Sequence, residues 1–153
     1  MYFIDIMLLI KAIIHAARGI ASCSKALNRT EYIANICNQM ADLIGEKDSN
    51  KFVVTTCVHV LDLLIDKNEL AVFSVFFPKL FAPFLVISQQ PYYGTLQYDD
   101  PSHTSWDNAS IERAIRGLTR IMITGSVMPN IMDSCSLLIP AVFHAYVFAE
   151  SSK

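Results

Sequence analysis

Residues 28–65, NRTEYIANICNQMADLIGEKDSNKFVVTTCVHVLDLLI, decide the fold class of this chain. Asn28 opens the stretch as a helix cap, and Glu31 follows three residues later in the pattern of a capping box. Apolar residues then recur at three- and four-residue spacing until Gly45, a residue type at which helices commonly stop. The pattern predicts a helix over residues 30–44.

A short polar turn over residues 46–50 comes next. Asp48 or Ser49 can cap a further helix over residues 51–65. The β-branched run 53–56 also permits a strand, but the apolar spacing and the length of the segment favour a helix. Two helices joined by so short a turn must lie antiparallel.

The same periodicity continues on both sides of this pair. It predicts further helices over residues 2–22, about 69–88, 110–123 and 129–149. Pro78 and Pro83 should bend or divide the helix that contains them. We therefore predict an all-α chain of about six helices in antiparallel pairs, forming one HEAT- or armadillo-like α-solenoid segment over residues 1–153. A closed helical bundle is the structural alternative.

Residues 89–108 interrupt the helical pattern. They contain prolines, a glycine and several aromatic residues without helical periodicity, which predicts an irregular loop of unusual length. The aromatic residues either pack the loop onto the solenoid edge or anchor a binding partner, with packing or simple mobility the plainer explanation. The candidate partner-binding residues are Tyr92, Tyr93, Tyr98 and Trp106.

The composition is apolar for a free-standing soluble domain. Hydrophobic residues make up 53% of the 153 residues and charged residues 17%, and the mean hydropathy is +0.38. A bilayer, a neighbouring protein or the remainder of a longer chain could each cover the excess. The net charge of −2 and the absence of a basic patch give no support to a nucleic-acid partner.

Two apolar stretches are long enough to test as membrane spans, residues 70–87 and residues 132–149. The first holds Lys79 and two prolines near its centre, and the second holds Asp133 and His144. A charge at mid-span is costly, and prolines free backbone groups that lipid cannot satisfy. We therefore predict buried solenoid helices and keep an integral membrane protein as an alternative.

The sequence offers no catalytic, cofactor-binding or metal-binding constellation. The cysteines form no CxxC pair, and the histidines lack further ligands at metal-binding spacing. These residues are Cys23, Cys37, Cys57, Cys135, His15, His59, His103 and His144. We interpret the cysteines as buried thiols of a reducing compartment and the histidines as helix or loop residues. The prediction is a non-enzymatic protein without cofactor or metal.

Several segments resemble the transport and Golgi organisation protein six family. Residues 20–23 and 31–39 resemble a family segment in which "ASC" precedes a "YY…ICPQ" helix, with Asn38 here where the family has a proline. Further matches follow in the family's order, at residues 42–44, 54–56, 77–83, 125–140 and 143–148. Together they cover residues 16 to 150.

The resemblance implies a segment of a longer α-solenoid without catalytic residues. It also implies a non-enzymatic scaffold in protein secretion and Golgi organisation, located in the cytoplasm with Golgi or other membrane association. A related fungal protein assists assembly and nuclear import of RNA polymerase II, so an adaptor for that enzyme is an alternative. The expected partners are proteins, either trafficking components or polymerase subunits, and not nucleic acids.

Overall fold

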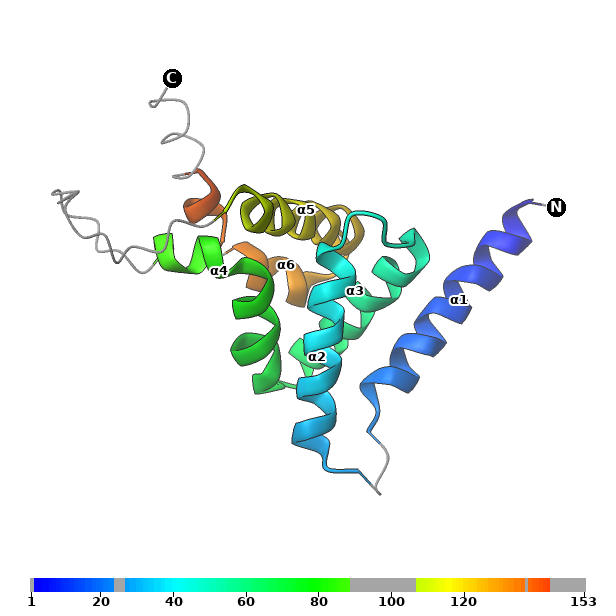
Figure 1. The fold of residues 1–153 in the computed structure, drawn as a ribbon. Helices are drawn as coiled ribbons and strands as arrows, with labels where there is room; N and C mark the ends of the chain where they lie inside the picture. Colours follow the sequence, from blue (N-terminus) through cyan, green and yellow to red (C-terminus); the bar gives the residue numbers. More distant parts are fainter. Residues whose placement is uncertain (1, 24–26, 89–106, 137, 144–153) are drawn as a thin grey trace, which may run out of the picture.

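The computed structural model describes residues 2–23, 27–88, 107–136 and 138–143, which form a stack of helices (Figure 1). The elements are α1 (Tyr2–Ala21), α2 (Arg29–Gly45), α3 (Lys51–Asp66), the π-helix η1 (Val72–Phe76), α4 (Phe77–Ser88), α5 (Asn108–Gly125) and α6 (Pro129–Ser136). None of these described ranges contains a strand, and residues 53–56 lie within α3. The all-α prediction is confirmed.

Side chains cap the two helices that decide the fold. Asn28 accepts hydrogen bonds from the backbone N–H groups two and three residues ahead, at 3.1 and 3.5 Å. Asn50 caps α3 in the same way at 2.8 Å, so the prediction of Asp48 or Ser49 as the cap is wrong. Only the residue directly before the first turn can reach its free N–H groups. Ser49 instead donates to the carbonyl of Leu43.

α2 ends at Gly45 as predicted. The glycine is not needed there for a left-handed backbone conformation. No described glycine has a positive φ. A Cβ at Gly45 would lie 2.6 Å from Arg113 Nε and 2.9 Å from Leu80 Cδ1, and a Cβ at Gly117 would lie 2.8 Å from Leu80 Cδ2. Leu80 of α4 therefore lies in a notch between glycines of α2 and α5. The missing Cβ atoms let the three helices approach closely.

The helix predicted over residues 69–88 is divided, as its prolines indicated. The π-helical turn η1 precedes α4, and the α4 backbone departs from helical geometry at Phe81, with φ −114° and ψ 16°. Pro83 has no N–H to donate and its ring crowds the carbonyl four residues earlier, which accounts for the kink. Aromatic contacts with centroid distances of 5.5 to 6.2 Å join Phe73, Phe76, Phe77 and Phe81 into one cluster.

α5 begins earlier than predicted. Its cap is Asp107, whose carboxylate accepts from the Ser110 N–H at 2.8 Å. Asn108 is the first helical residue, so any irregular loop ends by residue 107. The remainder of the predicted loop lies outside the described residues.

α6 is shorter than the helix predicted over residues 129–149. It ends at Ser136, and residues 139–143 are helical again. Pro140 cannot donate to the carbonyl four residues earlier and its ring crowds that group, which favours a break in the helix near this point. An α3 carboxylate supports the start of α6, because Asp62 accepts from the N–H of Ile131 at 3.2 Å.

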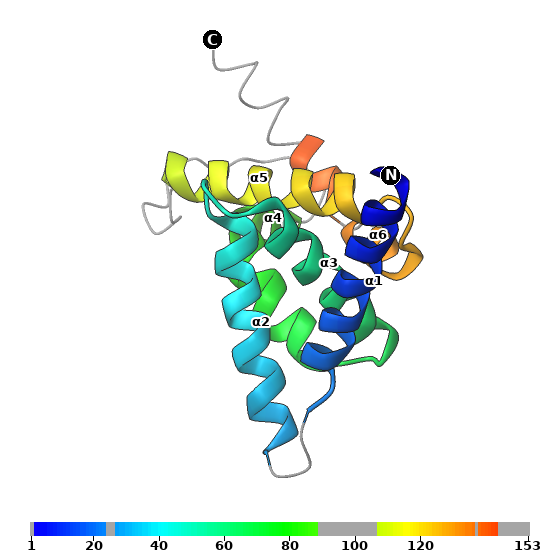
Figure 2. The same ribbon diagram turned by 90° about the vertical axis from the view of Figure 1, so that its right-hand side faces the viewer.

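The first three helices reverse direction one after another, as short turns require. α1 and α3 consequently run the same way and lie side by side, with α2 antiparallel to both (Figures 1 and 2). α2 is the central helix and packs against α3, η1, α4 and α5. In both views α5 lies across the C-terminal end of α2. This crossing positions the site described below.

One apolar core runs through the stack from the end of α1 to residue 141. Burying a large aliphatic or aromatic side chain contributes about 1.5–3 kcal/mol, so this core is the main source of stability. Its largest fully buried members include Phe76, Phe81, Phe84, Ile33, Ile44, Leu61, Leu64, Ile121 and Ile131.

Within the described residues, no helix is both long enough and apolar enough to cross a bilayer. The stretch 70–87 is divided by η1 and the α4 kink, and the described part of 132–149 breaks after Ser136. The membrane-spanning alternative therefore gains no support.

Candidate functional site: the arginine-lined junction of α2, α4 and α5

The C-terminal end of α2 meets the side of α5 through polar contacts. A helix leaves its last backbone carbonyls without partners inside the helix, and these carbonyls carry the negative end of the helix dipole. Cationic donors from another helix can both hydrogen-bond these carbonyls and compensate the negative end of the dipole. α5 supplies such donors from three arginines on one face, Arg113, Arg116 and Arg120.

Each arginine reaches a different part of the α2 terminus. Arg113 donates to the carbonyl of Ala41 at 3.2 Å, and Arg116 donates to that of Gly45 at 2.8 Å. Arg120 reaches furthest along the chain. It donates to three carbonyls, those of Ile44 at 2.8 Å, Glu46, and Lys47 at 3.0 Å. α5 therefore caps the C-terminus of α2 in place of a local motif.

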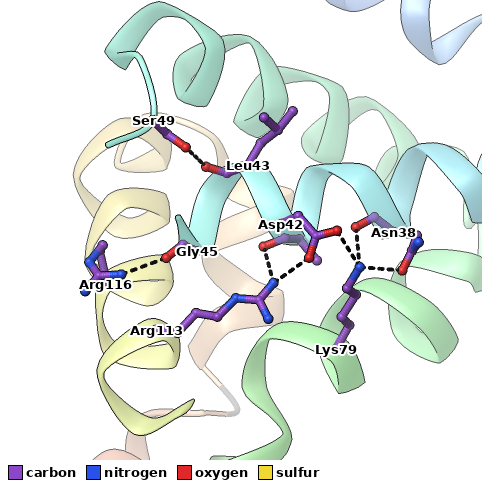
Figure 3. A network of polar contacts seen from close by, with 9 residues as sticks. Asn38, Asp42, Leu43, Gly45, Ser49, Lys79, Arg113 and Arg116 are labelled. Carbon is purple, nitrogen blue, oxygen red and sulfur yellow. Dashed lines mark hydrogen bonds and ion pairs between the residues drawn. The ribbon is translucent and has the colours of Figure 1, made fainter. Parts of the chain in front are cut away.

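Asp42 joins this cap to α4. One carboxylate oxygen accepts from Arg113 at 2.7 Å and the other accepts from Lys79 at 2.6 Å (Figure 3). Lys79 also donates to the backbone carbonyl of Asn38 at 3.1 Å and to its side-chain oxygen at 2.7 Å. A single α2 carboxylate thus holds a cation from α4 and a cation from α5.

The charges at this junction favour an ionised Asp42. The hydrogen bond and charge of Lys79, followed by those of Arg113, hold the pKa of the Asp42 carboxyl below its usual value. Its side chain is 55% exposed, so water screens the pairs and limits their contribution to stability.

A surface hollow of about 470 Å³ lies beside the network. It is lined by Asp42, Gly45, Glu46, Lys47, Ala109, Glu112, Arg113 and Arg116. Among the described lining residues, acidic and basic side chains are equally represented, and Asp42, Arg113 and Arg116 already bind groups of the protein. The arrangement therefore holds the helices together.

Burial keeps three of the four cysteine thiols, Cys37, Cys57 and Cys135, in the protonated and less reactive form. Burial raises the pKa of the Cys37 and Cys57 thiols to about 11 each and that of Cys135 to about 12. Burial lowers the pKa of His59, against an opposing effect of Asp62. In the described part of the chain, no three His, Cys, Asp or Glu side chains come close enough to hold a metal ion.

The predicted site and the observed junction do not coincide. Tyr92, Tyr93, Tyr98 and Trp106 lie outside the described residues, so their role stays a prediction. Arg113, Arg116 and Arg120 are not among the site residues predicted from the sequence. Their spacing at 113, 116 and 120 was the available signal, because it places three cations on one helix face.

Antiparallel helices on one continuous core, with a helix laid across the end of its neighbours, fit an armadillo-like helical-repeat protein. The family described as "Transport and Golgi organization protein 6 homolog, ARM-like repeat" matches residues 10–153, and the chain belongs to this family. The resemblance seen in the sequence is thereby confirmed. Comparison with curated proteins and with solved structures returned no significant match.

Proposed function

We propose that this chain is a non-enzymatic scaffold that binds proteins of the secretory pathway at the Golgi. The observation that carries the proposal is the family match over residues 10–153, which joins an armadillo-like repeat to a transport and Golgi description. Armadillo-like repeats present extended surfaces that bind other proteins.

The junction of α2, α4 and α5 supports a scaffolding role. Its arginines and Asp42 form their hydrogen bonds with other helices of the same chain. Such contacts fix the angle at which α5 crosses α2, and a fixed angle gives the solenoid a defined surface. Partner-binding residues are then expected on exposed positions of that rigid frame.

As part of this proposal, we place the protein on the cytoplasmic side of Golgi membranes, held there by its partners. Protonated, buried thiols at Cys37, Cys57 and Cys135 suit a reducing compartment. We also retain Tyr92, Tyr93, Tyr98 and Trp106 as proposed partner-binding residues.

Proximity labelling in cells, with the labelling enzyme fused to the chain, tests the proposal. Enrichment of vesicle-coat, tethering or cargo-receptor proteins over a cytosolic control is the expected result. Enrichment of RNA polymerase II subunits in their place would favour the adaptor alternative and overturn the Golgi scaffold.

A loop variant tests the proposed binding residues in the same assay. Replacement of Tyr92, Tyr93, Tyr98 and Trp106 by serine should reduce the labelling of direct partners. The matched control carries D99N and D100N in the same segment and should label as the wild type does. Equal labelling by all three proteins would remove these four residues from the proposal.

A further inference from the structure

The stretch of α1 over residues 6–10 exposes apolar side chains in every direction. Five consecutive residues are between 41% and 59% exposed: Ile6, Met7, Leu8, Leu9 and Ile10. Successive helical residues are about 100° apart, so five in a row span more than a full turn. A stable exposed helix normally has a polar face toward water, and this segment has no polar face.

The second half of the same helix is anchored. Ala17 and Ala21 are completely buried, and Ile20 packs against the core. The hydroxyl of Tyr32 donates to the carbonyl of Ile20 at 2.8 Å, which ties the end of α1 to α2. In Figure 1 the N-terminal end of α1 leans away from the other helices. The family match begins at residue 10, so most of the exposed apolar turn precedes the matched repeat.

A cationic hollow follows directly along α1. Its volume is about 620 Å³, and its described lining consists of Lys11, Ala12, Ile14, His15 and Arg18. The basic residues are four and three positions apart and so share one face of the helix. No carboxylate is among this described lining. α1 therefore presents an apolar turn followed by a basic face.

We propose that the N-terminal half of α1 docks an acidic amphipathic helix of another protein. The apolar face of that helix would cover the turn at 6–10, and its carboxylates would meet Lys11 and Arg18. This is the helix-against-helix mode of recognition, in which apolar anchors give affinity and charges give register. The inference rests on the proposed scaffold function, for which it specifies the chemistry of one partner.

Charge distinguishes this occupant from two others. A second copy would present the same apolar turn and the same basic face, and the described lining of that face has no carboxylate to pair with Lys11 and Arg18. The apolar segment between Asp5 and Lys11 is only about 7 Å long along the helix axis and cannot span a bilayer, and the vesicle experiment below tests contact with an anionic membrane surface. An acidic helix meets the apolar and the basic surface together.

Selection on the purified chain tests the proposal without reference to the Golgi. A library of helix-forming peptides, randomised on one face at apolar and charged positions, is panned against the wild type. We expect the selected peptides to combine an apolar stripe with Asp or Glu at three- and four-residue spacing. Selected peptides without that acidic pattern would overturn the proposal.

Binding measurements on one synthetic selected peptide then locate its site. In the double variant K11E/R18E, affinity should fall at least tenfold, and L8S should weaken binding as well. The matched control K51E/K67E reverses two exposed cations outside the hollow and should bind as the wild type does. Circular dichroism checks that every variant is folded. Equal binding to wild type and K11E/R18E would overturn the proposal.

The same proteins exclude the other occupants. Concentration-dependent dimerisation in sedimentation velocity that L8S abolishes would assign the surface to a second copy. Sedimentation with phosphatidylserine vesicles, lost in K11E/R18E and without peptide binding, would assign it to lipid. Either result overturns the proposal. If labelling in cells recovers trafficking proteins equally with K11E/R18E, the scaffold function stands and the α1 site falls.

Discussion

Arg113 passes directly over Gly45, so that a Cβ at residue 45 would lie 2.6 Å from its Nε and 2.7 Å from its Cγ. The arginine cannot easily move aside, because its guanidinium binds both the Ala41 carbonyl and the Asp42 carboxylate. Leu80 blocks the other side at 2.9 Å and is buried. Neighbouring side chains from two other helices therefore require a glycine at position 45.

Replacing Gly45 with alanine should destabilise the fold. Overpacking of this kind costs about 1–3 kcal/mol, and the better helix propensity of alanine returns up to about 1 kcal/mol. We expect a net loss of about 1–2 kcal/mol in urea unfolding. Gly19 is the matched control, because a Cβ there meets nothing within 4 Å. G19A should be neutral or stabilising, and a G45A variant as stable as G19A would contradict the packing argument.

Replacing Arg120 should weaken the cap on α2 more than replacing Arg116. Arg120 binds three carbonyls and Arg116 binds one. Hydrogen bonds from a charged donor contribute about 1.5–3 kcal/mol where they are sheltered, so R120A should cost about 2 kcal/mol and R116A about half of that. R120K keeps the charge without the planar fork and should recover only part of the loss. Equal costs for R116A and R120A in chemical unfolding would refute this order.

The Asp42 ion pairs should make stability depend on acid pH. The pKa of Asp42 in the folded state lies below its unfolded value of about 3.9, so its ionised form stabilises the fold above that pH. The contribution disappears as the pH falls through the folded-state pKa.

D42N should therefore lower stability at neutral pH and make no difference at strongly acid pH. Because the carboxylate is half-exposed, we expect about 1 kcal/mol or less at low salt, and a smaller value in 1 M salt. Unfolding curves of both proteins across the acid range provide the measurement. A difference that is constant with pH would show that lost packing, and not lost charge, is the cause.

The three buried thiols should resist modification until the chain unfolds. A thiol with a pKa of about 11 is ionised to only about 0.1% at pH 8, and the side chains of Cys37, Cys57 and Cys135 are also shielded. C23S removes the partly exposed cysteine, so any labelling then reports on these three. We expect negligible reaction with a thiol reagent in native buffer and complete reaction in denaturant. Rapid native labelling would mean that the core opens locally.

Local chemistry made most of the helices predictable. Asn28 and Asp107 cap helices through bonds to residues two or three positions ahead, and Pro83 bends α4 through atoms within one turn. Signals of this range lie within the sequence itself. The cap of α3 was predicted one or two residues too early, and the final helix was predicted without a break near Pro140. Both errors concern interactions within one helical turn.

The candidate site was less predictable, because its contacts join distant positions. Arg116 and Gly45 are 71 residues apart, and Arg120 and Ile44 are 76 apart. The arginine spacing indicates a polar face on α5. Nothing nearby in the sequence predicts that this face binds the carbonyls of α2. Gly45 shows the same limit. Its position at a helix end was predicted from the sequence. The need for a glycine there depends on the packing of Arg113 and Leu80.

The sequence by itself determined the fold class, the approximate position of most helices and the family, because periodicity, caps and ordered motifs are local or linear properties. Tertiary structure alone decided that α5 caps α2, that Asp42 links α4 to α5, and that residues 6–10 of α1 are exposed within the described fold. The physical reason is that hydrogen-bond partners and exposure depend on which helices meet, and packing of the whole core sets that choice.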